Sequence, residues 1–265
     1  MSGGDIALIV AATFAAGFLN AAAGGGSLVS FPAMVAAGLP PLTANVSNTL
    51  ALWPGYLSGA ASLRPNLQRG VHLRQLCVAA GVGAVVGSIL LLVADSAVFD
   101  AVVPFLVLAA AALLAMPSRW ITRRGAVAAS PAGAAGAGAA GDEAGTAARL
   151  RPVSLVVVGV GGAYGAYFGG ALGVVLLAVL SAFVGGGLRS LNATKTVLSL
   201  LVNTVALVAF VGFAPVDWTA VAVGAPASLV GGVAGGLAST RIDPRVLRWG
   251  IVAYATVAGL VMLVA

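Results

Sequence analysis

The sequence predicts an all-α polytopic membrane protein built from two inverted repeats of about five segments each, with helices that are broken by glycine or re-entrant. Of its 265 residues, 60% are hydrophobic and 8% are charged, which is more apolar surface than a soluble domain of this length can bury. Apolar runs of about 20 residues recur, the length that crosses a hydrocarbon core of about 30 Å. A glycine-broken, polar-punctuated stretch at 17–49 has a related stretch at 162–199, and such duplication is typical of transporters built from repeats.

Ten apolar segments follow one another along the chain, five in each half. They are expected at residues 5–22, 26–38, 42–63, 71–94 and 97–117, and then at 152–168, 170–186, 190–213, 217–239 and 243–265. The domains are therefore a first transmembrane repeat (1–117), a cytoplasmic Ala/Gly-rich linker (118–151) and a second transmembrane repeat (152–265).

The short segments 26–38 and 170–186 must each return to the side from which the preceding segment entered. If each continued its predecessor as one kinked span, the second half would turn over and its basic residues would face outward. Either two full spans or a re-entrant hairpin satisfies this requirement. Both arrangements make a half that enters on one side and leaves on the other, so the two halves have opposite orientations.

The basic residues set the expected topology. They are Arg64, Arg69 and Arg74 in one loop, Arg119, Arg123, Arg124, Arg149 and Arg151 in the linker, Arg241, Arg245 and Arg248 near the end, and Arg189 and Lys195 at the 186–195 junction. The positive-inside rule then places the basic loops in the cytoplasm and both termini outside. We expect a multi-pass protein of the bacterial plasma (inner) membrane, and the net charge of +6 reflects this topology rather than nucleic-acid binding.

Short matches support the repeat. Gly38-Leu39 and Leu42–Asn45 line up with Gly187-Leu188 and Leu191–Thr194. Gly17 and Gly24-Gly25 likewise correspond to Gly162 and Gly169-Gly170. The matches occur in the same order at a nearly constant offset.

At these residues the sequence resembles the sulfite exporter TauE/SafE family of membrane permeases, over nearly the whole chain outside the linker. The resemblance rests on Gly24–Gly26 followed by Phe31-Pro32, on the turn at 38–45, and on Arg189 followed by Asn192–Lys195. The second half departs from the pattern, because Leu177 stands where a proline would match Pro32 and Ala171 replaces the third glycine. The resemblance implies transport of small sulfur-containing or organic anions, such as sulfite, sulfonates and sulfoacetate-like compounds.

The residues themselves favour an anion as ligand. All seven carboxylates lie in loops, in the linker or at segment ends, whereas a cation site at membrane depth would be expected to contain one. Lys195 is the one basic residue clearly inside an apolar segment, and Arg189 precedes it near the interface. Lysine offers a compact charge and arginine a bidentate fork. Alternatively, both are anchors that reach to the lipid headgroups.

Glycine breaks and uncharged polar side chains complete the candidate site. A half-helix that starts at a glycine break would present backbone N–H groups and its positive end to an anion, and amide and hydroxyl groups could donate to it. The candidate substrate-binding residues are Asn20, Gly24, Gly25, Gly26, Asn45, Asn48, Thr49, Gly169, Gly170, Arg189, Asn192, Thr194, Lys195 and Asn203. The alternative for these residues is helix packing and interhelical hydrogen bonding. Packing is the expected role of Gly81, Gly83, Gly87, Gly231, Gly232, Gly235 and Gly236.

The sequence therefore predicts a secondary transporter of small anions, with export as the expected direction, that works by alternating access around a central site between the repeats. An anion channel, or a carrier of other small organic anions, stays open. We do not expect an enzyme, because one His, one Cys and no buried carboxylate leave no nucleophile-base or metal-ligand set. No cofactor and no metal are expected. The expected partners are the small anion and the lipid bilayer, with a homodimer left open and no nucleic acid.

Overall fold

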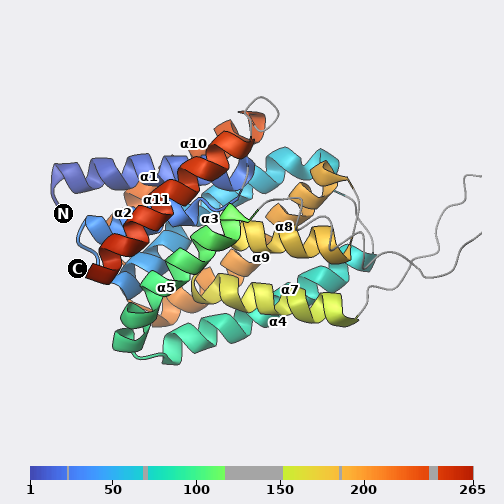
Figure 1. The fold of residues 1–265 in the computed structure, drawn as a ribbon, viewed down its shortest axis with the longest axis horizontal. Helices are drawn as coiled ribbons and strands as arrows, with labels where there is room; N and C mark the ends of the chain where they lie inside the picture. Colours follow the sequence, from blue (N-terminus) through green and yellow to red (C-terminus); the bar gives the residue numbers. More distant parts are fainter. Residues whose placement is uncertain (23, 68–70, 117–151, 185–186, 239–243, 265) are drawn as a thin grey trace, which may run out of the picture.

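A computed structural model describes residues 1–22, 24–67, 71–116, 152–184, 187–238 and 244–264. Throughout these residues the chain forms helices and connecting turns and contains no β-strand (Figure 1). The predicted all-α fold is confirmed. The predicted linker at 118–151 lies outside the described residues.

The helices fall where the apolar segments predict them, within a few residues. The first half contains α1 (Gly3–Ala22), α2 (Ser27–Ala36), α3 (Pro41–Leu63), the 3₁₀ turn η1 (Arg64–Asn66), α4 (Val71–Val93) and α5 (Ser96–Ala115), and the second half contains α7 (Pro152–Tyr167), α8 (Leu172–Phe183), α9 (Leu188–Phe213), α10 (Trp218–Ala238) and α11 (Pro244–Val264). Six of them, α1, α4, α5, α9, α10 and α11, are long and apolar enough to cross a membrane. The protein is thus a polytopic membrane protein.

The short helices α2 and α8 form hairpins with the helices before them. With 10 and 12 residues, they are about 15 and 18 Å long, which is about half of a bilayer core. Positive φ angles at Gly24 (93°) and Gly25 (87°) turn the chain back so that α2 packs on α1. Gly169 (74°) and Ala171 (57°) do the same between α7 and α8. Of the two arrangements left open by the sequence, the structure has the hairpin.

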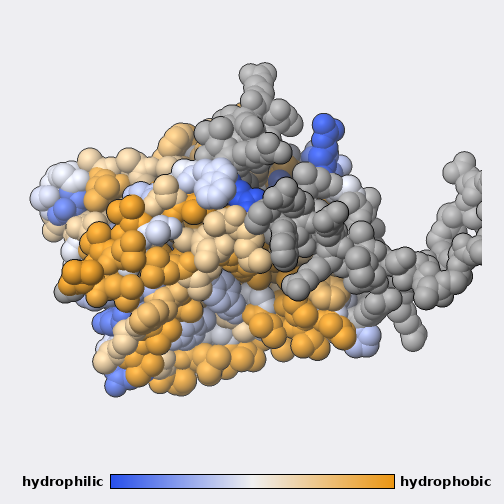
Figure 2. All heavy atoms as spheres, in the orientation of Figure 1, coloured by the Kyte–Doolittle hydropathy of each residue, from blue (hydrophilic) through white to orange (hydrophobic). Residues whose placement is uncertain are grey.

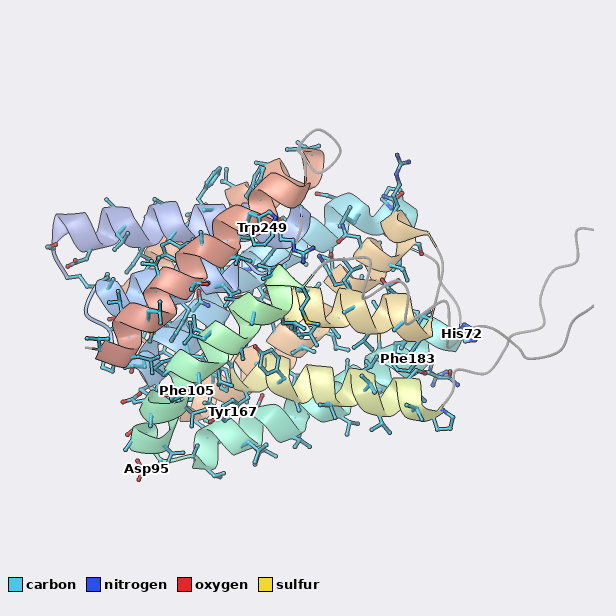
Figure 3. The ribbon with its side chains drawn as sticks, viewed as in Figure 1. His72, Asp95, Phe105, Tyr167, Phe183 and Trp249 are labelled. Atoms are coloured by element: carbon cyan, nitrogen blue, oxygen red, sulfur yellow. The ribbon has the colours of Figure 1, made fainter. Side chains whose placement is uncertain are left out.

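The two ends of the molecule carry different parts of the chain. Both termini lie at one end (Figure 1), as does Asp95, whereas His72 lies at the opposite end (Figure 3). Phe183, the last residue of α8, lies toward the end that carries His72 (Figure 3). This is the separation that the charge pattern predicts. Which end faces the cytoplasm stays a prediction.

The two halves pack on each other through equivalent contacts. Helix α1 packs against α10 and α7 against α4, while α3 packs against α10 and α9 against α4. At the centre α3 contacts α9, and α5 contacts α11. Exchanging the halves leaves this set of contacts unchanged, and the counterparts α1 and α7 run in opposite directions in Figure 1. The face of the molecule that Figure 2 shows is largely hydrophobic. Helix α4 also exposes Val78, Val82 and Ile89, as contact with lipid requires.

Glycines spaced four residues apart bring the outer helix pairs together. A Cβ atom at Gly83 or Gly87 of α4 would clash with a backbone oxygen of α7, and one at Gly231 or Gly235 of α10 would clash with a backbone oxygen of α1. Such close approach is how helices associate in lipid. The expectation for Gly81 is wrong, because a Cβ atom there would meet only the side chain of Leu201, at 3.9 Å.

We predict that Gly87→Ala lowers the free energy of unfolding by about 1–3 kcal/mol, because α4 and α7 must separate to admit the methyl group. Thermal unfolding in detergent measures the effect. Gly250→Ala is the matched control, since a Cβ atom there would meet nothing within 4 Å and alanine favours the helix. Equal melting temperatures for the two variants would contradict the packing role.

Candidate functional site

The glycine break after α1 is held by a buried asparagine. The backbone N–H of Gly26 donates to Asn20 Oδ1 at 2.8 Å, and that of Gly24 donates to Leu19 O at 2.6 Å. Because an N–H group must point at the oxygen of the amide, the free end of the Asn20 side chain is its NH₂ group. Asn20 is 5% exposed, and its Nδ2 is buried without a hydrogen-bond partner in the described residues. The first break, Gly24–Gly26, therefore has an unused hydrogen-bond donor beside it.

Lys195 of α9 reaches the same break from the other half of the chain. Its side chain is 1% exposed, and its Nζ donates to Asn20 O at 3.4 Å, a long hydrogen bond. Within the described part of the chain Lys195 has no carboxylate partner. An ammonium group carries three donors and a full charge, so this buried cation is left largely uncompensated.

The first glycine break touches the start of α8 beside Lys195. A Cβ atom at Gly24 would lie 3.3 Å from the carbonyl carbon of Gly173, at the start of α8. A Cβ atom at Gly173 would lie 3.6 Å from Cδ and Cε of Lys195. The turn of the first hairpin, the start of α8 and Lys195 thus meet at one place, between the halves of the molecule.

Tyr56 of α3 links the first break to the next turns of α9. Its side chain is 5% exposed, and its hydroxyl lies close to the side chains of Ser27 and Asn203. Asn203 Nδ2 in turn donates to Ser199 O at 2.8 Å. We call Asn20, Ser27, Tyr56, Lys195, Ser199 and Asn203 the first-break cluster.

The second break, Gly169–Ala171, has different chemistry. Asn45 Nδ2 donates to Tyr167 O at 3.0 Å, and the Tyr164 hydroxyl donates to Gly170 O at 2.6 Å. The buried Asn45 Oδ1 has no partner, so the group left over there is an acceptor. In the register of the repeat, Val46 corresponds to Lys195. The second break therefore has no counterpart of Lys195, so the first break is the more favourable place for an anion to bind.

The remaining candidates lie outside the first-break cluster. Asn48 Oδ1 accepts from the Ser30 hydroxyl at 2.6 Å, and the Thr49 hydroxyl donates to Asn45 O. Thr194 is buried and Asn192 is half-buried, next to Lys195 in α9. Arg189 is exposed in the first turn of α9, about 9 Å along the helix from Lys195. The structure therefore groups Asn20, Gly24–Gly26, Lys195 and Asn203, and leaves Arg189 apart from them.

Three members of the first-break cluster are not among the candidate residues that the sequence predicts, namely Ser27, Tyr56 and Ser199. A signal existed for two of them, because Ser199 lies four residues after Lys195 and Tyr56 lies seven after Thr49, and both spacings return to the same helix face.

The chain matches the family model described as Sulfite exporter TauE/SafE over residues 9–262. It is 36% identical over 109 residues to a "Probable membrane transporter protein ORF9" of Sinorhizobium sp, covering 40% of this chain and 41% of that protein. It is also 36% identical over 107 residues to a "Probable membrane transporter protein" of Haemophilus influenzae, covering 39% and 41%. The matched region thus spans about two fifths of the length of these curated relatives. No solved structure matches the chain.

We predict that Asn20→Asp stabilises the protein, because the new carboxylate oxygen replaces the unpartnered NH₂ group beside the Lys195 ammonium. A double-mutant cycle with Lys195→Met, followed by thermal unfolding in detergent, measures the coupling between the two side chains, which we expect to be about 1–3 kcal/mol in favour of the pair. Zero coupling would mean that the Asn20 side chain and the ammonium do not interact.

Proposed function

This chain belongs to the sulfite exporter TauE/SafE family, and we propose that it is a secondary transporter of small anions whose binding site is the first-break cluster. The substrate class we propose is sulfite, sulfonates or sulfoacetate-like organosulfur compounds, with export as the direction. The observation that carries the proposal is the buried Lys195 ammonium, which has no carboxylate partner in the described part of the chain.

A charge at this depth costs free energy unless something compensates it. A structural lysine would be expected to contact a carboxylate or several carbonyl groups, whereas Lys195 makes one long hydrogen bond to the described part of the chain. An anion bound beside its Nζ would supply the missing charge, and the Asn20 NH₂ group would donate to it. Both groups repel a cation and favour an oxyanion.

Alternating access fits the way in which the cluster is assembled. Asn20, Ser27 and Tyr56 come from the first half, and Lys195 and Asn203 come from the second. A movement of one half against the other would therefore open the cluster toward one end of the molecule and then toward the other. Lys195 is 1% exposed, which is the closed arrangement expected between those two states.

The membrane orientation that we propose follows from the distribution of the basic residues. We propose a bacterial plasma membrane location with both termini extracytoplasmic, supported by the positions of the basic residues in the sequence and by the positive-inside rule.

We predict that Lys195→Gln abolishes anion binding in a folded protein, because the amide is isosteric with part of the lysine but carries no charge. Isothermal titration of the purified protein with sulfite, sulfate, thiosulfate, sulfoacetate, taurine and acetate tests this. Arg74→Gln is the matched control, since it removes one positive charge from an exposed position on α4. If the two variants bind equally well, Lys195 does not form the site.

Counterflow tests the transport mechanism. In proteoliposomes preloaded with the anion that binds, we expect uptake of labelled anion from outside to be faster than in empty vesicles and to saturate with concentration. Flux that neither saturates nor responds to preloading would indicate an anion channel instead.

A further inference from the structure

Ser199 departs from the behaviour of its neighbours in α9. A serine or threonine inside a helix commonly donates to the carbonyl oxygen four residues earlier. Thr196 does so to Asn192 O at 2.8 Å, and Thr204 to Leu200 O at 2.7 Å. Ser199 is 0% exposed, yet its hydroxyl has no hydrogen-bond partner among the residues that the structure describes. A buried hydroxyl without a partner costs free energy, so its presence requires an explanation.

The position of Ser199 relates it to Lys195. The two residues are four apart and lie on the same face of α9, about 6 Å apart along the helix axis. Their side chains can therefore reach one small anion. The carbonyl oxygen of Ser199 accepts from Asn203 Nδ2, and the Asn203 side chain lies close to Tyr56.

A second unpartnered donor belongs to Asn20, which Lys195 contacts. Asn20 Nδ2 is buried without a partner, in the residue whose carbonyl oxygen accepts from Lys195 Nζ. Two residues near the lysine thus carry an unused donor, Ser199 from its own half and Asn20 from the other half. Unpartnered buried polar atoms are few in folded proteins, and two of them beside an uncompensated ammonium point to a ligand.

We propose that Ser199 is a substrate-binding residue, whose hydroxyl donates to the same compact oxyanion that Lys195 neutralises, with the Asn20 amide as the third donor. Tyr56 and Asn203 act as positioning residues that fix this stretch of α9. The inference rests on the proposed function, since it adds a ligand to the proposed anion site. It assigns to the ligand at least two oxygen acceptors, one facing α9 and one facing the end of α1.

The alternative is that Ser199 has only a packing role, as a small side chain where the helices pack closely. Ser88 of α4 provides the comparison, because it is 1% exposed and its hydroxyl also lacks a partner, but it lies outside the first-break cluster. If burial alone explained Ser199, the two serines would respond alike to substitution.

The experiment compares Ser199→Ala with Ser88→Ala, using sulfite, thiosulfate and sulfoacetate as probes in isothermal titration. We expect Ser199→Ala to weaken binding of the anion that the wild type binds by about tenfold to a hundredfold, the effect of losing a hydrogen bond to a charged group. The melting temperature of the empty protein should stay the same or rise, because an unpartnered hydroxyl is removed. Ser88→Ala should bind like the wild type, and Ser199→Thr should retain part of the affinity.

Wild-type affinity in Ser199→Ala, together with loss of binding in Lys195→Gln, would overturn the role of Ser199 and leave the proposed function standing. An equal loss of affinity in Ser199→Ala and Ser88→Ala would also overturn it. If the wild type binds none of the three probes, the proposed substrate class and this inference are both overturned.

Discussion

The buried ammonium of Lys195 is the constraint on which the central part of the structure depends. Its side chain passes Gly173 and ends at Asn20 O, so a charge from the second half lies against the broken end of a helix from the first. Asn20 stabilises that end by accepting from Gly26 N. The glycines leave room for this approach, because side chains at Gly24 and Gly173 would crowd the opposite backbone.

The same arrangement explains why two similarly built halves give one asymmetric site. Helix contacts are equivalent between the halves, and both chain reversals use left-handed backbone near glycine. The chemistry differs because Val46 stands where the second half has Lys195, and because the amide of Asn45 is turned to leave an acceptor while that of Asn20 leaves a donor. Only the first break is suited to a negative charge.

Much of the fold was predictable, because ten apolar segments and two glycine breaks are properties of the sequence. Lys195 and Asn20 were also predictable as polar residues at membrane depth. The length of α2 and the turn at Gly24 decide between a hairpin and two spans, and these depend on the folded backbone. Ser199 was missed because sequence does not tell whether a helical hydroxyl bonds to its own backbone.

The most direct test of the proposed anion site is anomalous diffraction from crystals grown with selenite, which replaces the sulfur of sulfite with a heavier atom. The account predicts a selenium peak within hydrogen-bonding reach of Lys195 Nζ and the Ser199 hydroxyl, between the two glycine breaks. A peak elsewhere, such as beside the exposed Arg64 at the end of α3, or the absence of any peak at an anion concentration that saturates binding, would contradict it.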